Sequence, residues 1–325
     1  MTKKATDEIY ALGVDLGGNN LRWGLVSSKG EIVKHDKVTS RAYKDKDQAI
    51  AYILNSIAKA VKTYKKEGFN IKGVGFALPG LIIKEKGYVH ESPNFKQLNG
   101  VYVKQLLEEM IGLPVIIEND VNAWAWGEHT FGKAKKYKHF MVMTLGTGVG
   151  GGVVLDGNLL DGEDGTAGEV GHMTIYPNGL ECQCGNFGCL ERYASGTGLV
   201  DNLKQNMYTD EGKALIKKIG KKVDKITPFE LYTEAKNKNK LARRLFKQAG
   251  TTLGIGIANL VNLLNLDAVV IGGGVSAAWD IIVPELKKEM KKRAFSLPAK
   301  RCKILKSTLG DNGGILGMAE MILEL

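Results

Sequence analysis

Short apolar runs that end in glycine, or in an acidic or amide residue, alternate with longer stretches in which apolar residues recur every three or four positions. The runs are typical of buried strands and the longer spacing is typical of amphipathic helices, so the alternation predicts an α/β fold. The clearest expected strands are Ile9–Val14, Leu21–Val26, Ile71–Leu78, Val115–Glu118, Phe140–Leu145, Val153–Leu155 and Ala268–Ile271. The clearest expected helices are Gln48–Tyr64, Leu253–Leu266 and Ile315–Leu325.

Two pairs of these strands follow the same plan. In each pair a glycine-rich turn joins the strands, at Asp15–Gly18 in the first pair and at Gly146–Gly152 in the second. This repetition predicts a duplicated α/β domain that faces its copy across a central cleft. The length of 325 residues also exceeds one comfortable hydrophobic core, which favours two domains.

Composition excludes one class of protein. Hydrophobic residues make up 44% of the chain and charged residues 25%, and no uninterrupted apolar run approaches the ~20 residues of a membrane span. We therefore expect no membrane partner. The segment Met1–Glu8 is polar and lacks the apolar core of a signal peptide, so we expect a cytoplasmic protein.

The formal net charge of +10 raises the question of nucleic-acid binding. Lysine supplies most of this charge, and the lysine-rich segments are scattered without regularly interleaved aromatic residues. We therefore expect a solvated basic surface and no nucleic-acid partner, although a positive field attracts a polyanionic nucleotide. The segments are Lys62–Lys66, Lys133–Lys138, Lys217–Lys225 and Lys287–Arg293.

The segment Gly168–Arg192 combines soft metal ligands with carboxylates. His172, Cys182, Cys184 and Cys189 form a donor set that suits a closed tetrahedral zinc site, in which the ion is structural. The single residue between Cys182 and Cys184 departs from the usual spacer of two to four residues. Ordinary reduced thiols and a disulfide therefore remain alternatives.

Three glycine clusters suggest contact with a large anion. They lie at Gly17–Gly18, Gly146–Gly152 and Gly272–Gly274. Backbone amides in bare glycine turns can approach phosphate oxygens that a side chain would block. Neither familiar phosphate-binding fingerprint fits, so plain tight turns remain an alternative for each cluster taken singly.

Eight motifs, spread over nearly the whole chain, resemble the ROK sugar kinases of the actin and hexokinase superfamily, and most of all their glucokinases. The motifs are Asp15-Leu-Gly-Gly18, Leu78-Pro-Gly80, Ser92-Pro-Asn94, Glu118-Asn-Asp-Val-Asn122, Leu145-Gly-Thr-Gly148, Gly168-Glu-Val-Gly-His172, Cys182-x-Cys-Gly-x-x-Gly-Cys189-Leu-Glu191 and Ile271-Gly-Gly-Gly274. The resemblance implies two ribonuclease H-like α/β domains with mixed sheets flanked by helices. We expect a smaller domain of residues 1–119 plus 311–325, and a larger domain of residues 120–310 that contains the zinc loop 168–192.

The resemblance also implies an activity and its residues. It implies transfer of the γ-phosphate of ATP to the 6-hydroxyl of glucose, with Asp120 as general base, magnesium positioned by Asp15 through water, and structural zinc. The sugar-contacting positions that it implies are Gly80, Asn94, Asn119, Asp120, Glu169, His172 and Glu191. The nucleotide and magnesium positions are Asp15, Gly17, Gly18, Asn19, Asn20, Arg22, Thr147, Gly148, Gly273 and Gly274.

Each of these roles has a simpler alternative. Asp120 follows a strand and precedes a helical stretch, so its carboxylate could only cap the helix. Glu169 and Glu191 could be solvated loop carboxylates, and Asn94 after proline could be an ordinary turn residue. Asn19 stands where the family usually has threonine, which leaves the preferred phosphate donor open.

Other functions within the family remain alternatives. An N-acetylmannosamine or N-acetylglucosamine kinase would share most of these motifs, but Thr197 stands where such kinases often have arginine and favours an unmodified hexose. The family also includes repressors, in which a winged helix-turn-helix precedes the kinase-like body. Only fourteen residues precede Asp15 here, so we expect a kinase. The resemblance further implies a homodimer or homotetramer.

Overall fold

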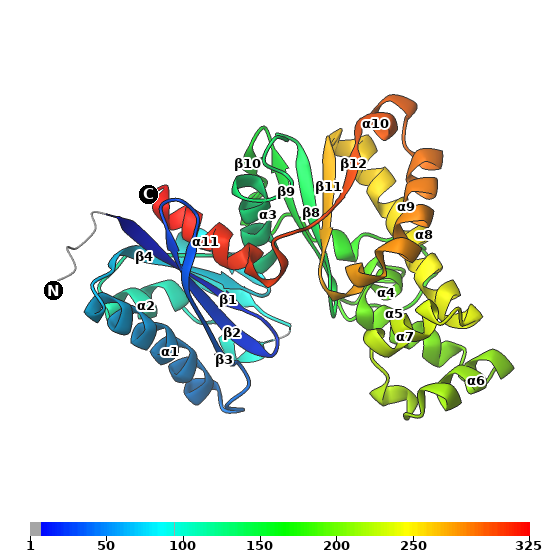
Figure 1. The fold of residues 1–325 in the computed structure, drawn as a ribbon, viewed down its shortest axis with the longest axis horizontal. Coiled ribbons are helices and arrows are strands. Elements are labelled where there is room, and N and C mark those ends of the chain that lie inside the picture. The colour runs from blue at the N-terminus through cyan, green and yellow to red at the C-terminus, as the bar shows by residue number, and fades with distance from the viewer. Residues whose placement is uncertain (1–7, 94) are drawn as a thin grey trace. The chain divides into compact units, whose positions relative to one another are not determined.

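A computed structural model describes residues 8–93 and 95–325 (Figure 1). The chain divides into two compact units. The first unit comprises residues 1–136, 152–167 and 308–325, and the second comprises residues 137–151 and 168–307. The first unit runs past residue 119 because helix α3 (Asp120–Thr130) packs against the C-terminal helix α11 (Gly313–Leu323). The domain boundaries expected from the sequence stay a prediction.

The first sheet has five strands in the order β3-β2-β1-β4-β7. Strands β1, β2 and β3 are antiparallel neighbours, whereas β4 and β7 continue the sheet parallel to β1. All four strands expected in this region are confirmed, with slightly longer bounds. The strands are β1 (Ile9–Leu16), β2 (Asn20–Ser27), β3 (Ile32–Thr39), β4 (Asn70–Leu78) and β7 (Val115–Asn119).

The second five-stranded sheet has the order β10-β9-β8-β11-β12. Position by position this is the order of the first sheet, and the central strand again pairs in parallel with the strand that follows the hairpin. The shared order confirms that the two glycine-tipped hairpins belong to repeated units of ribonuclease H type. The strands are β8 (Phe140–Leu145), β9 (Val149–Leu155), β10 (Asn158–Leu159), β11 (Ala268–Gly272) and β12 (Lys303–Lys306). A separate ribbon pairs β5 (Leu81–Ile83) with β6 (Tyr88–Glu91).

Helices account for most of the remaining chain. Among the described residues, none of them is both long and apolar enough to cross a bilayer. The other helices are α1 (Lys46–Lys66), α2 (Val103–Ile111), α4 (Glu191–Ala194), α5 (Gly196–Gln205), α6 (Asp210–Ile219), α7 (Pro228–Lys236), α8 (Lys240–Leu264), α9 (Trp279–Arg293) and α10 (Ser296–Arg301). Short 3-10 turns are η1 (Lys84–Lys86), η2 (Lys96–Leu98), η3 (Val170–His172), η4 (Val223–Lys225), η5 (Gly274–Ala278) and η6 (Gly310–Asn312).

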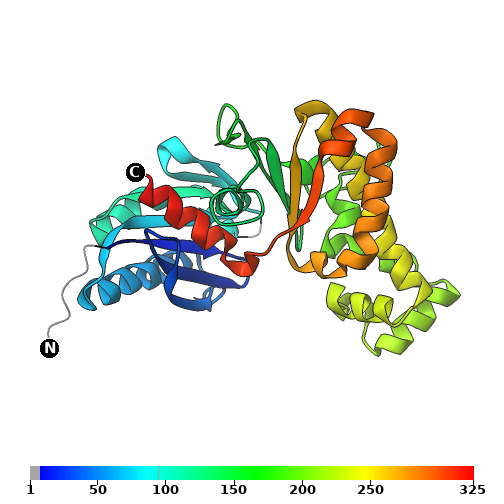
Figure 2. The ribbon, with the colours of Figure 1, turned by 45° about the horizontal axis from the view of Figure 1, so that its top comes forward.

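Helices cover both faces of the first sheet. Leu12 and Val14 of β1 belong to the apolar cluster that includes α1, whereas Ala11 packs with Ile315 and Ala319 of α11. Figure 2 shows α11, in red, crossing the sheet. Because both faces of β1 are buried from Tyr10 to Val14, this part of the strand is an unbroken apolar run and does not alternate.

Helix α11 approaches α3 through glycines. A Cβ atom on Gly317 would lie 1.8 Å from the carbonyl oxygen of Ala123, and one on Gly127 would lie 2.3 Å from the carbonyl oxygen of Gly313. Only residues without a side chain allow the two backbones to come this close. The same packing places Gly314 at the start of α11 beside Asp15, where a Cβ atom would lie 3.6 Å from the Asp15 carboxyl carbon.

We expect Gly317→Ala to destabilise the first unit by about 1–3 kcal/mol, because the added methyl forces the helices apart by more than the gain in helix propensity offsets. Urea denaturation of the purified protein measures the change. Gly146→Ala is the matched control, since no atom lies within 4 Å of the methyl that it adds. Equal stability of the Gly317 variant and the wild type would show that the helices separate without cost.

Candidate active site

The turn between β7 and α3 carries the predicted base. Asn119 is the N-cap of α3, and its Oδ1 accepts hydrogen bonds from the backbone N–H groups of Val121 at 2.8 Å and Asn122 at 3.2 Å. Asp120 is therefore the first residue of the helix and not its cap, so the capping alternative is wrong. The helix dipole favours a carboxylate at this position.

The amide nitrogen of the Asn119 side chain contacts the segment that contains Gly80. Asn119 Nδ2 donates to the carbonyl oxygen of Gly80 at 3.1 Å. Gly80 has φ of +108°, and a Cβ atom there would lie 2.2 Å from the carbonyl oxygen of Glu91. Both facts require glycine. The structure thus brings Gly80, Asn119 and Asp120 together in the first unit, whereas Asn94 lies outside the described residues.

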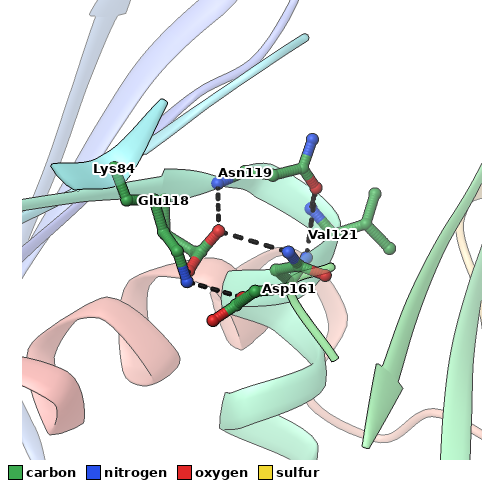
Figure 3. A network of polar contacts seen from close by, with 6 residues as sticks. Lys84, Glu118, Asn119, Val121 and Asp161 are labelled. Carbon is green, nitrogen blue, oxygen red and sulfur yellow. Dashed lines mark hydrogen bonds and ion pairs between the residues drawn. The ribbon is translucent and has the colours of Figure 1, made fainter. Parts of the chain in front are cut away.

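An ion network around the buried carboxylate of Glu118, which sequence reasoning missed, supports this turn (Figure 3). Glu118, only 2% exposed, accepts hydrogen bonds at Oε1 from the Asn119 backbone N–H (2.8 Å) and Asn122 Nδ2 (3.2 Å). Its Oε2 accepts from Lys84 Nζ at 2.8 Å, and Lys84 Nζ also lies 2.6 Å from Asp161 Oδ1. We call Lys84, Glu118 and Asp161 the Lys84 network. Glu118 belongs to a recognised motif, but nothing in the sequence pairs it with Lys84.

Burial and charge oppose one another in this network. Burial raises the pKa of Glu118, while the ammonium of Lys84 and the hydrogen bonds to the carboxylate lower it and leave a net upward shift. Burial lowers the pKa of Lys84, but the carboxylates of Glu118 and Asp161 more than offset this and raise it. Lys84 therefore stays cationic, and its charge favours the ionised form of Glu118.

Asp15 lies at the end of β1 beside a cation. Its carboxylate is 3.9 Å from Arg22, which also pairs with Asp311 at 3.1 Å. Burial raises the pKa of Asp15 to about 6, the Arg22 charge lowers it, and the Asp311 charge raises it. A divalent cation held near this carboxylate would supply the charge compensation that Arg22 supplies only in part.

The glycine turn after Asp15 exposes its backbone. Gly17 N donates to the carbonyl oxygen of Asn20 at 2.9 Å, while Gly18 and Asn19 are exposed. Two residues that directly follow β3, and that sequence reasoning did not single out, donate hydrogen bonds to this turn. Ser40 Oγ donates to the Gly17 carbonyl oxygen at 3.0 Å, and the Arg41 side chain donates to the Gly18 carbonyl oxygen.

In the second unit, the Gly146–Gly148 turn between β8 and β9 lies against Glu191. Glu191 Oε2 accepts a hydrogen bond from the Val149 backbone N–H at 2.9 Å, and a Cβ atom on Gly148 would lie 2.2 Å from the same oxygen. Glycine at 148 thus makes room for the carboxylate. Glu191 is therefore anchored to this turn and is not a freely solvated side chain, whereas Glu169 is exposed.

A cavity of about 560 Å³ opens beside this turn. Thr147 and Gly274 lie at its rim, and Gly273, with φ of +83°, turns the chain there: a Cβ atom on Gly273 would lie 2.5 Å from the Leu145 carbonyl oxygen. The volume falls within the usual range for pockets that bind small molecules. Its lining is largely apolar and includes Val200, Ile226, Pro228, Phe229, Tyr232, Phe246 and Val275.

The predicted metal ligands converge in the second unit. One donor atom each from His172, Cys182, Cys184 and Cys189 lies within 4.8 Å of all the others. Cys184 Sγ lies 3.8 Å from Cys189 Sγ, and Cys182 Sγ lies 3.6 Å from His172 Nδ1. A tetrahedron with Zn–S bonds of about 2.3 Å and a Zn–N bond of about 2.0 Å has S–S edges of about 3.8 Å and S–N edges of about 3.5 Å.

This geometry argues against the disulfide alternative. A disulfide needs sulfur atoms about 2.05 Å apart, and all four cysteines of the chain are free thiols in the structure. His172 Nδ1 faces the cysteines, so Nε2 lies on the far side of the ring. Glu191 follows Cys189 by two residues and begins α4, so the loop that holds the cluster also sets the position of Glu191.

Known proteins resemble this chain over almost its whole length. The ROK family pattern matches residues 11–324. A glucokinase of Thermotoga maritima is 34% identical over 98% of this chain and 98% of its own length. A xylose repressor of Caldicellulosiruptor bescii is 33% identical over 96% of this chain and 78% of its own length. The crystal structure of a ROK family glucokinase from Streptomyces griseus, in complex with glucose and AMPPNP, covers 97% of this chain and 100% of its own, with 30% identity and a TM-score of 0.81.

These likenesses confirm the expected α/β fold of the actin and hexokinase type, with mixed sheets flanked by helices. The family match spans both repeated units and every motif quoted from the sequence. The chain therefore belongs to the ROK family, whose glucokinases it resembles from end to end.

Proposed function

We propose that this protein is an ATP-dependent hexose kinase that phosphorylates the 6-hydroxyl of glucose, with Asp120 as the general base. The observation that carries the proposal is the placement of Asp120 at the first position of α3, behind an asparagine that already caps the helix. Its carboxylate is thus not needed for capping. Likeness to glucokinases in both sequence and structure supports the same assignment.

Sugar recognition follows from fixed polar groups. A hexose presents a ring of hydroxyls, which carboxylates and amides on rigid elements can satisfy in one geometry. The Asn119 amide, the backbone at Gly80 and the Asp120 carboxylate supply such groups in the first unit, and Glu169, His172 and Glu191 supply them in the second. Asp120 takes the proton of the attacking hydroxyl.

Nucleotide binding uses the glycine turns and the cavity. The largely apolar cavity beside Thr147 and Gly274 suits an adenosine group, and the exposed backbone of Gly18 and Asn19 in the turn that Gly17 closes suits phosphate oxygens. Asn20 and Arg22 flank that turn. Magnesium, held near Asp15, would neutralise the charge that develops on the transferred phosphoryl group. These assignments agree with the general demand of phosphoryl transfer for positioning and charge compensation.

We also propose that the Cys/His cluster holds structural zinc. Four donors close a tetrahedral site, which leaves no open position for a substrate. Zinc would fix the loop 168–192 and, through Cys189, the start of α4 at Glu191. His172 Nε2, on the far side of the ring, could then contact a sugar hydroxyl while Nδ1 binds the ion.

Two other functions within the family are tested against this proposal by the choice of sugar. An N-acetylmannosamine or N-acetylglucosamine kinase is the nearest alternative, and a sugar-sensing regulator is a second, since a xylose repressor is 33% identical. Coupled ADP-release assays with ATP and magnesium over glucose, mannose, fructose, N-acetylglucosamine and N-acetylmannosamine decide among them. Preference for an acetylated sugar would overturn the assignment of glucose as the substrate. No turnover on any sugar would overturn the assignment of kinase activity.

Asp120→Asn tests the base directly. We expect kcat to fall by about 10²-fold or more while glucose still binds, because the amide keeps the shape of the side chain but cannot accept the proton. Steady-state kinetics and calorimetric glucose titration provide the two readouts. Asp36→Asn, an exposed aspartate on β3, is the control. Turnover near the wild-type rate would eliminate Asp120 as the base.

Cys184→Ser tests the metal. Cys184 is exposed, so without zinc its replacement should change stability by no more than about 0.5 kcal/mol. If zinc binds here, the variant should instead lose zinc and melt at a lower temperature, because metal binding is coupled to folding of the loop. Elemental analysis and thermal unfolding measure both. Cys302→Ser, outside the cluster, should retain zinc; a Cys184 variant with full zinc and normal stability contradicts the site.

Asp15→Asn tests the raised pKa of the Asp15 carboxyl group. The folded protein holds the Asp15 proton more tightly than the unfolded chain, so Asp15 makes the protein less stable as pH rises from about 4 to about 6. Without magnesium or nucleotide, the variant should gain on the order of 2 kcal/mol relative to wild type at pH 7 but little at pH 4. It should also lose activity. Urea denaturation across this pH range measures the difference; parallel curves would refute the elevated pKa.

A further inference from the structure

We propose that Lys84 is a positioning residue for the catalytic turn, which it orients through the buried carboxylate of Glu118. The inference rests on the proposed function, since it gives Lys84 a role in placing Asp120. Lys84 Nζ donates to Glu118 Oε2, and Glu118 Oε1 accepts from the backbone N–H of Asn119. Lys84 thus acts on Asn119, and on Asp120 after it, through the side chain of Glu118.

The first step is the state of Glu118. A carboxylate that is 2% exposed is costly to keep ionised unless a cation and hydrogen-bond donors compensate it. Lys84 Nζ, at 2.8 Å, is the cation that contacts it directly. Removing this ammonium would favour the protonated acid, which accepts hydrogen bonds less strongly and adds a proton that needs a new acceptor.

The second step is the pair of hydrogen bonds that Glu118 accepts from the turn. Its Oε1 accepts from the backbone N–H of Asn119, the residue just before Asp120, and from the side chain of Asn122, one turn into α3. One oxygen therefore joins the end of β7 to the first turn of α3. Asn119 in turn caps the helix and holds Gly80. A rotation of Glu118 would break its two hydrogen bonds to the turn and remove the support of Asn119, which makes the other contacts.

The third step is the position of Lys84 in the chain. It begins η1, directly after β5, and β5 directly follows Gly80. The same segment therefore meets the turn twice, through the Gly80 carbonyl and through the Lys84 ammonium. Asp161, 41% exposed, holds Lys84 from the other side. That outer pair is screened by water and contributes little, whereas in the inner pair the carboxylate of Glu118 is desolvated and depends on the ammonium for compensation.

The network lines a cavity of about 430 Å³, which offers a matched control. Lys104 of α2 lines the same cavity and carries the same charge, but the hydrogen bonds and ion pairs of Glu118 described above do not include it. Lys104→Met removes a lysine from the same surroundings. It should leave both the turn and the activity unchanged.

The kinetic test is a double-mutant cycle. Lys84→Met should lower kcat/KM for glucose by about 10- to 100-fold, because a small displacement of the base is enough to cause this loss. Lys84→Arg should recover most of the activity. In the Glu118→Gln background, where no charge needs a partner, Lys84→Met should cost no more than about 3-fold further, and this non-additivity identifies action through Glu118.

Hydrogen exchange of the ligand-free proteins supplies a readout that needs no turnover. The amides of Asn119, Val121 and Asn122 should exchange faster in Lys84→Met and Lys84→Gln, and at the wild-type rate in Lys104→Met. If Lys84→Met does not fold, the double variant with Glu118→Gln should fold, because it contains no unpaired buried charge. If wild type phosphorylates no sugar, the kinase proposal fails while hydrogen exchange still tests Lys84.

Two results would overturn the role of Lys84. The first is a Lys84→Met enzyme with kcat/KM within 2-fold of wild type and unchanged exchange at the turn. The second is an additive cycle, in which Lys84→Met costs the same with Glu118 or Gln at position 118. A loss of thermal stability alone, with normal activity per folded molecule, would assign Lys84 a structural role only.

Discussion

The junction between β7 and α3 is the constraint on which the first unit's site depends. A helix that begins directly after a strand leaves its first backbone N–H groups without partners inside the helix. Asn119 satisfies two of them with a single oxygen, and Glu118 satisfies the N–H of Asn119 itself. Because Asn119 and Glu118 meet the needs of these backbone groups, capping does not compete with the role of base proposed for Asp120. Within the Glu118–Asn122 motif, Glu118 and Asn119 thus hold the structure around the residue proposed for the chemistry.

In the second unit, the corresponding question is what fixes the position of the Glu191 carboxylate. In the described structure, the segment 168–192 contains short helical turns and no long helix or strand that would fix the position of its carboxylates. Four soft ligands from this segment meet at distances that fit a tetrahedral ion. Glu191, near the end of this segment, accepts a hydrogen bond from the Val149 N–H, and glycine at position 148 leaves space for its carboxylate. The proposed metal ligation and the missing side chain at position 148 would together fix the position of Glu191.

Sequence reasoning located the strands because both faces of β1, β4 and β8 are covered, which leaves unbroken apolar runs. It also found the cluster of one histidine and three cysteines, since such a donor set is local in the sequence and rare. It missed Lys84 and Asp161, because their pairing joins segments 77 residues apart and a lysine in a turn looks like any solvated lysine. It left open whether Asp120 caps α3, because spacing alone cannot tell which of Asn119 and Asp120 faces the helix N–H groups.

Likeness alone does not decide between catalysis and regulation here. A glucokinase and a xylose repressor are 34% and 33% identical to this chain, so overall similarity favours neither. Function has to be argued from the site. A sugar sensor needs groups that bind hydroxyls, and it has no need of a carboxylate oriented for proton transfer or of a nucleotide pocket. This chain has both an aspartate at the start of α3 and an apolar cavity of about 560 Å³ beside a glycine turn. Their coexistence favours the kinase.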